Sequence, residues 1–266
     1  MRRGKSEKKD VAAQDASKTS KKDTSMKITL CIPLYNEEKI LPGTVKQAKE
    51  FMARYGDEGE LIFIDDGSTD GSLAILREAE DVRTRVITYT PNRGKGYAVR
   101  QGMLMGEGDF IIFTDCDLAY GLEKAAEMAD AFFAHPEWDG VIGSRHLGKS
   151  GDEGYTFLRK LASRAYLGIL KTYGGLKHSD SQCGIKGFSR RVAREIFSLC
   201  EMDRFSFDFE AILIARRLGF EIGEYPVTIV NHRESKVNIW RDSTGMLKDL
   251  RRIKRRLKKG NIGKNP

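Results

Sequence analysis

A short apolar segment that runs directly into two acids places the strongest constraint on how this chain folds. Residues 109–114 have the sequence Asp-Phe-Ile-Ile-Phe-Thr, which predicts a buried strand because aromatic and β-branched residues favour strands. Asp115 and Asp117 follow at once. Carboxylates at the end of a core strand need water, a partner or a cation, and on extended backbone residues two apart point to the same side. The spacing predicts either a shared Mg²⁺ or Mn²⁺ site or two acids that cap the following helix.

Strands and helices alternate through the first half of the chain. Helical patterns separate the predicted strands, which cover 27–34, 60–65, 84–89 and 109–114, and a further strand is predicted over 139–143. This alternation predicts an α/β fold with a mostly parallel, Rossmann-like sheet flanked by helices. Ser68 is the predicted N-cap of the helix that follows the second strand.

Polar motifs follow these strands at their carboxyl ends, where open α/β sheets bind ligands. Lys95 lies on a glycine-rich turn before a predicted helix, which favours contact with a phosphate. A P-loop would need Ser or Thr after Lys95, where the chain has Gly96, and a dinucleotide fingerprint would need glycine in place of Val99. The rim of the sheet is therefore predicted to bind a nucleotide diphosphate compound bridged by a metal ion.

Positive charge is concentrated at the two ends of the chain, whose net charge is +8. Residues 1–27 carry nine Lys and Arg against four acids, and residues 241–266 carry ten against two, so the region between them is acidic. The polar residues 1–25 are predicted to be a disordered basic tail. Basic ends suit nucleic acid or an anionic membrane surface. Aromatic residues do not alternate with the basic runs, which disfavours nucleic acid.

Cysteine usage and hydropathy predict the compartment. The four cysteines are scattered without a CxxC pair, as expected for reduced core thiols in the cytosol. No segment approaches the roughly 18 apolar residues that span a bilayer, and the Lys-rich start lacks the apolar stretch of a secretory signal. We therefore expect a cytoplasmic protein, peripheral at the cytoplasmic face of a membrane.

Two amphipathic helices are predicted in the second half, over 157–173 and 246–259. The second has an apolar stripe, and nearly all its other residues are Lys or Arg; the stripe consists of Met246, Leu250, Ile253 and Leu257. Such a helix either lies on a membrane surface or docks its stripe on the protein core, and the density of basic residues favours anionic lipid. The predicted division is a tail (1–25), a main domain (26–240) and a basic C-terminal helix and tail (241–266).

The motifs together resemble the inverting family-2 glycosyltransferases with a GT-A fold, from about residue 27 to residue 238. The resemblance rests first on IPLYNEE, IDDGSTDGS, NRGKGYAVRQG and FTDCDLA. Later segments are most similar to dolichyl-phosphate β-glucosyltransferases and related polyprenyl-phosphate glycosyltransferases: GSR, DSQCGIKGFSR, FDFEAILIARRLGFEIGEYPV and SKVN.

The chain departs from these families in two respects. It shows no N-terminal membrane anchor, and Cys116 stands where alanine is common. Ala119 and Gly121 occupy places where the mannosyl-transferring branch often has Gln and Pro, which favours the glucosyl-like branch.

The resemblance implies roles on the donor side. Pro33, Tyr35, Glu37 and Asp66 would line the nucleotide base and ribose, where carboxylates accept hydrogen bonds. The alternative for Asp66 is a turn acid before glycine. Lys95 would contact the donor phosphates. The remaining implied donor and metal ligands are Asp115 and Asp117, which would hold Mg²⁺ or Mn²⁺ on the diphosphate.

Asp180 is the residue implied for the acceptor side. It would act as a general base toward a sugar hydroxyl, whereas a lipid phosphate is already largely anionic at neutral pH, and Asp180 would then orient the acceptor or the sugar. A helix or turn cap is the structural alternative. Arg145, Lys186 and Gln182 are the implied acceptor and phosphate contacts.

The leading hypothesis is transfer of a hexose, from UDP-glucose, to a polyprenyl or dolichyl phosphate with inversion. Three alternatives stay open: a family-2 glycosyltransferase with a soluble sugar, glycan or protein acceptor; a basic nucleic-acid-associated protein; and a non-catalytic nucleotide-sugar sensor.

Overall fold

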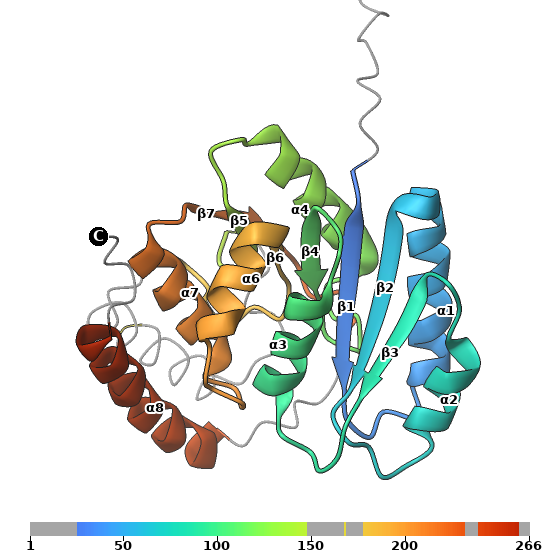
Figure 1. The fold of residues 1–266 in the computed structure, drawn as a ribbon, viewed down its shortest axis with the longest axis horizontal. Helices are drawn as coiled ribbons and strands as arrows, with labels where there is room; N and C mark the ends of the chain where they lie inside the picture. The colour runs from blue at the N-terminus through green and yellow to red at the C-terminus, as the bar shows by residue number, and fades with distance from the viewer. Residues whose placement is uncertain (1–25, 148–167, 169–177, 232–238, 261–266) are drawn as a thin grey trace, which may run out of the picture.

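A seven-stranded sheet organises the protein (Figure 1), in the order β3-β2-β1-β4-β6-β5-β7. The computed structural model describes residues 26–147, 168, 178–231 and 239–260. The strands of the first half run parallel to one another and comprise β1 (Ile28–Leu34), β2 (Gly59–Asp65), β3 (Thr84–Thr88) and β4 (Phe110–Phe113). They confirm the predicted parallel α/β sheet, with ends that differ by one residue from those expected.

The second half of the sheet is mixed. β5 (Gly140–Ser144) confirms the predicted fifth strand, and β7 (Ile222–Pro226) lies parallel to it at the edge. Between β4 and β5 the chain inserts β6 (Lys186–Ser189), which is antiparallel to both. Neither β6 nor β7 was predicted, because Lys-Gly-Phe-Ser and Ile-Gly-Glu-Tyr-Pro lack a clear apolar alternation.

Helices cover both faces of the sheet (Figure 1). Side chains of β1 alternate between the two layers: Leu30 and Ile32 belong to one apolar cluster and Cys31 to the other, as the period of two along a strand requires. The first cluster includes α1 (Leu41–Met52), α2 (Ser72–Ala79) and α4 (Leu122–Ala134), with the 3₁₀ helix η1 (Ala53–Glu58) after α1. The second includes α3 (Lys95–Met105), α6 (Arg190–Leu199), α7 (Phe207–Leu218) and α8 (Ile239–Lys259).

Ser68 does not cap α2, contrary to the sequence-based expectation. The helix begins at Ser72 after Gly71, without a side-chain cap. The Ser68 hydroxyl instead accepts a hydrogen bond from the Asn36 backbone N–H at 2.9 Å. The Ser68 side chain is therefore used in a contact between the loops that follow β1 and β2, and it is not available to cap the helix.

The apolar stripe of α8 packs on the protein core. Leu250 and Ile253 are fully buried and Leu257 packs beside them, whereas the side chain of Met246 lies outside the described residues. The expectation that this stripe meets lipid is wrong for Leu250 and Ile253, because the α7 layer already covers them. Arg256 adds ion pairs to Glu201 (2.8 Å) and Glu210 (2.9 Å).

No helix in the described ranges is long and apolar enough to cross a membrane. The predicted helix over 157–173 lies outside the described residues except at Gly168, which is helical.

Replacing Gly187 by alanine tests the packing of β6 on β4. A Cβ atom at position 187 would lie 2.1 Å from Cζ of Phe110, so Gly187→Ala should lower the free energy of unfolding by about 1–3 kcal/mol through overpacking. The control is Gly43→Ala in α1, where nothing lies within 4 Å of the new Cβ and a gain of up to about 1 kcal/mol is expected. Urea unfolding measures both, and equal midpoints for Gly187→Ala and the wild type would contradict the packing.

Candidate active site

The two acids after β4 lie on a tight turn. The Leu118 backbone N–H donates to the Asp115 carbonyl at 2.9 Å, and Leu118 has a positive φ of 49°. The extended backbone considered for this segment is therefore not what forms. Asp117 Oδ1 accepts from the Ala119 N–H at 3.1 Å, and the Asn231 side-chain amide donates to the Leu118 carbonyl at 3.0 Å. The turn is thus held both locally and by the segment that follows β7.

Lys95 and Asp115 form an ion pair at the centre of the site. Lys95 is the first residue of α3, and its Nζ lies 2.5 Å from Asp115 Oδ1. Burial works to lower the pKa of Lys95, but the attraction of the nearby carboxylates Asp115, Asp208 and Asp117 raises it above its ordinary value. Lys95 is therefore held as a cation. Lys95 and Asp115 therefore lie together at the rim of the sheet, and their roles toward a donor stay predictions.

Gly184 brings the Asp180–Lys186 segment against the same acid. A Cβ atom at position 184 would lie 2.2 Å from Asp115 Oδ2, so this close approach requires glycine. The Gly184 N–H also points to the Tyr120 hydroxyl at 3.4 Å. The acid turn after β4 and the segment before β6 therefore meet at Asp115, although about 70 residues separate them in the chain.

Asp66 holds the loop that presents Lys95. Its carboxylate accepts the backbone N–H groups of Arg93 and Gly94, each at 2.8 Å, and the Asn92 side-chain amide at 2.7 Å. Asp66 is buried. These contacts hold a loop distant in sequence and not the turn before Gly67, and the role of Asp66 toward a nucleotide stays a prediction.

The glycine-rich turn also requires glycine because backbone atoms of another loop lie very close to it. A Cβ atom at Gly94 or Gly96 would meet the backbone carbonyls of Asp203 (2.5 Å) and Met202 (2.4 Å). The Asp203 carbonyl also accepts the Tyr97 N–H at 3.1 Å. The loop before α7 therefore covers the N-terminus of α3.

The remaining donor-side residues predicted from the sequence lie where β1 ends. Pro33 is in β1, and Tyr35 is 41% exposed just beyond it. The Glu37 N–H donates to the Ser72 hydroxyl at 2.9 Å, which fixes this loop against the start of α2.

Arg145 and Asp180 form a two-pronged ion pair. Arg145 directly follows β5; its Nε lies 2.6 Å from Asp180 Oδ2 and its Nη2 lies 2.9 Å from Oδ1. The backbone N–H groups of Arg145 and Gln182 add contacts at 3.2 Å each. Burial alone would raise the pKa of Asp180, but the Arg145 guanidinium holds it below its ordinary value. Such a carboxylate is a weak base at neutral pH and a good orienting group for Arg145.

Lys186 has a partner that the sequence analysis did not include. Its Nζ lies 2.5 Å from Asp208 Oδ1 on α7 and 2.5 Å from the Cys183 carbonyl, and both side chains are buried. Burial raises the pKa of Asp208 despite the opposing charges of Lys186 and Lys95. Lys186 therefore has an acid within the protein, and its predicted contact with a phosphate stays a prediction. The sequence signal that could have pointed to Asp208 is its place in a mostly apolar segment, Phe207–Ala215. Every residue of this segment is buried in the structure.

The site suits a divalent cation whose coordination is completed by substrate. Asp115 and Asp117 supply hard oxygen atoms, and the Lys95 ammonium against Asp115 shows that this position favours positive charge. Among the described residues, no group of three or more His, Cys, Asp or Glu side chains is arranged to hold a metal by itself. Mg²⁺ and Mn²⁺ sites with one or two carboxylates commonly take their other ligands from water and substrate phosphates.

Solved structures of other proteins share this fold. The glucosyl-3-phosphoglycerate synthase from Mycobacterium tuberculosis in complex with Mn²⁺ and UDP-glucose matches with a TM-score of 0.60 and 19% identity, over 85% of this chain and 79% of that one. The mannosyl-3-phosphoglycerate synthase from Rubrobacter xylanophilus matches with a TM-score of 0.62 and 16% identity, over 88% and 75%. These similarities confirm the predicted GT-A fold.

Sequence comparison then gives the family. The model for glycosyl transferase family 2 matches residues 29–197. Dolichyl-phosphate beta-glucosyltransferases are similar over most of the chain: the Drosophila melanogaster protein is 30% identical over 76% of this chain and 67% of its own length, and the Mus musculus protein is 31% identical over 84% and 73%. The chain therefore belongs to glycosyl transferase family 2, and it is a glycosyltransferase.

Asp180→Asn tests the ion pair with Arg145. The change should lower the free energy of unfolding by about 3 kcal/mol at neutral pH, because it leaves a mostly buried guanidinium without its anion. The pKa of Asp180 is lowered from 3.8; its contribution is therefore complete above pH 3.8 and is lost as the pH falls through the lower folded value.

Urea unfolding of this variant is compared with Asp130→Asn, which removes an exposed carboxylate of α4 and should change stability by no more than about 0.5 kcal/mol. Equal stability of the two variants at pH 7 would rule out a stabilising Arg145–Asp180 pair.

Proposed function

We propose that this enzyme transfers glucose from UDP-glucose to a polyprenyl phosphate of the dolichyl type, with inversion, at the cytoplasmic face of a membrane. The observation that carries the proposal is the identity of about 30% with dolichyl-phosphate beta-glucosyltransferases across most of the chain. The charged rim formed by Lys95, Asp115, Arg145 and Asp180 supports it, because both substrates carry phosphate.

Asp115 and Asp117 are the residues proposed to hold Mg²⁺ or Mn²⁺. When bound, the divalent ion supplies positive charge that stabilises the departing nucleoside diphosphate. Lys95 contributes a second positive charge to the same diphosphate. Pro33, Tyr35, Glu37 and Asp66 lie at the ends of the neighbouring strands β1 and β2 and are proposed to bind the base and ribose.

The acceptor side is proposed to orient an anion. A phosphate monoester is already mostly ionised at neutral pH, so its oxygen needs little help from a base to attack the anomeric carbon. The bond from that carbon to the diphosphate breaks on the opposite face, which inverts the configuration. Arg145, Lys186 and Gln182 are proposed to position the acceptor phosphate, and Asp180, whose pKa is lowered by Arg145, fixes the guanidinium rather than taking a proton.

The reaction itself is tested with purified protein, Mn²⁺, labelled UDP-glucose and a polyprenyl phosphate. Label should enter the organic phase, and Asp115→Asn and Asp117→Asn should each lower the rate by about a hundredfold or more, as loss of one transition-state charge contact does elsewhere. Absence of label in the lipid across several nucleotide sugars would refute the proposal. Label in a soluble sugar, glycan or protein instead would establish the alternative acceptor class.

The basic face of α8 is proposed to contact the anionic membrane surface. Lys248, Arg251 and Arg255 lie on the side of the helix opposite the buried Leu250 and Ile253. They are exposed, and in the described part of the chain no carboxylate pairs with them. Since the apolar stripe packs on the protein core, the proposed contact with the membrane is electrostatic.

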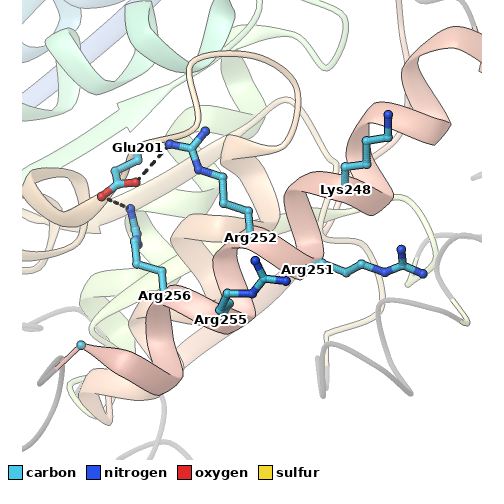
Figure 2. A pocket seen from close by; sticks show the side chains of 7 residues that line it. Glu201, Lys248, Arg251, Arg252, Arg255 and Arg256 are labelled. Atoms are coloured by element: carbon cyan, nitrogen blue, oxygen red, sulfur yellow. Dashed lines mark hydrogen bonds and ion pairs between the residues drawn. The ribbon is translucent and has the colours of Figure 1, made fainter.

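The neighbouring arginines are already neutralised. Figure 2 shows Arg252 and Arg256 reaching Glu201, while Lys248, Arg251 and Arg255 extend away from it. The hollow beside α8 that these residues line is therefore positively charged on its outer side.

Membrane contact is tested by changing Lys248, Arg251 and Arg255 together to Gln. Each basic residue near an anionic surface contributes about 1 kcal/mol, so the triple variant should bind phosphatidylserine vesicles roughly a hundredfold more weakly in a sedimentation assay. The matched control removes the same charge elsewhere on the exposed surface, with Lys39, Lys46 and Arg194 changed to Gln. Equal vesicle binding by the two triple variants would contradict a membrane-binding face on α8.

A further inference from the structure

Two ion pairs lie in the active site, one partly buried and one buried. Lys95 pairs with Asp115 at 2.5 Å, and Lys186 pairs with Asp208 at 2.5 Å. The Cys183 carbonyl that Lys186 contacts directly precedes Gly184, which packs on Asp115, and the two pairs interact electrostatically because Asp208 attracts Lys95 and is repelled by Asp115. The four side chains therefore form a neutral network of two cations and two anions.

Within this network the Asp115 side chain is 30% exposed, and each of its carboxylate oxygens has a close neighbour. Oδ1 faces the Lys95 ammonium. Oδ2 lies so close to Gly184 that a methyl group there would overlap with it. A divalent ion bound to Asp115 would therefore lie close to the Lys95 ammonium, and two like charges at such short range repel strongly in a partly buried site.

We propose that Lys95 is a resident counter-cation of Asp115 that the divalent metal replaces only when the donor diphosphate takes over the Lys95 ammonium. This inference rests on the metal and donor roles given under Proposed function. The diphosphate carries the negative charge that compensates for the extra cation, and Asp208 offers a second carboxylate within reach of the charge of Lys95. Metal binding and donor binding are then coupled, and the coupling is reciprocal by thermodynamic linkage.

The coupling gives Lys95 a positioning role in addition to contact with a phosphate. Without the donor, the Lys95–Asp115 pair keeps the acid neutralised and the metal weakly bound. With the donor, the lysine moves from the carboxylate to the diphosphate, and Asp115 becomes available to the metal. A residue that only contacted the diphosphate would not change the affinity of the protein for the metal alone.

Binding of Mn²⁺ alone, followed by the electron paramagnetic resonance signal of the free ion, distinguishes these roles. Lys95→Met removes the ammonium and keeps the chain length, so it should bind Mn²⁺ without nucleotide roughly tenfold more tightly than the wild type, within the usual range of coupling between sites. Lys95→Arg keeps the charge and should bind Mn²⁺ as weakly as the wild type. Lys124→Met, which breaks a Lys–Glu pair on α4, is the matched control and should leave the affinity unchanged.

A second series repeats the titration with saturating UDP, after subtraction of Mn²⁺ chelation by UDP measured without protein. UDP should tighten Mn²⁺ binding to the wild type roughly tenfold and to Lys95→Met much less. Lys95→Gln gives the same comparison if the Met variant does not fold.

Two results would overturn the exchange in different ways. If the wild type and Lys95→Met bind Mn²⁺ alone equally while both bind it with UDP, the metal site stands and the exchange fails. If no variant binds Mn²⁺ even with UDP, the metal role of Asp115 and Asp117 under Proposed function fails, and the exchange fails with it.

Discussion

The ion pair between Lys95 and Asp115 is the contact on which the arrangement of the active site depends. It joins the first residue of α3 to the turn after β4, and Gly184 packs on the same carboxylate from the segment before β6. A partly buried lysine and aspartate are costly unless they pair. Their pairing therefore requires three chain segments to converge, and the rim of the sheet becomes a single charged site.

The parallel half of the fold was predictable because its signals are local. β1, β2 and β4 are continuous apolar runs bounded by turn residues, which is typical of buried parallel strands. β6 is different: it contains only one large apolar residue, Phe188, and forms a strand because β4 and β5 both pair with it. Ser68 failed as a cap for a related reason, since its hydroxyl is bound by a loop distant in sequence. Pairing between distant segments leaves little trace in local periodicity.

The contrast between local signals and pairing of distant segments also applies to the active site. Position after strands predicted that Lys95 and the two acids would lie at one edge of the sheet, and Lys95 contacts Asp115, two residues before Asp117. Partners could not be predicted, because the sequence does not state which acid meets which base. Asp180 was expected to act as a base toward a sugar hydroxyl or to orient a lipid phosphate acceptor, and its oxygens are bound by Arg145, a contact that favours orientation. Asp208 was missed as a site residue because it lies in a mostly apolar stretch of α7, Phe207–Ala215, yet it neutralises Lys186.

The apolar stripe of α8 could pack against either a membrane or the protein core, and its burial in the folded chain distinguishes the two. An apolar stripe beside many basic residues has the same periodicity whether it meets lipid or protein, because both present an apolar surface. In the folded chain Leu250 and Ile253 are buried on the α7 layer, and Arg256 reaches the buried Glu210. Removing the stripe from the core to insert it in a bilayer would expose that core and leave Glu210 without its guanidinium. The membrane contact that we propose for the docked helix therefore involves only its outer lysine and arginine side chains, and such a contact weakens as salt screens the charges.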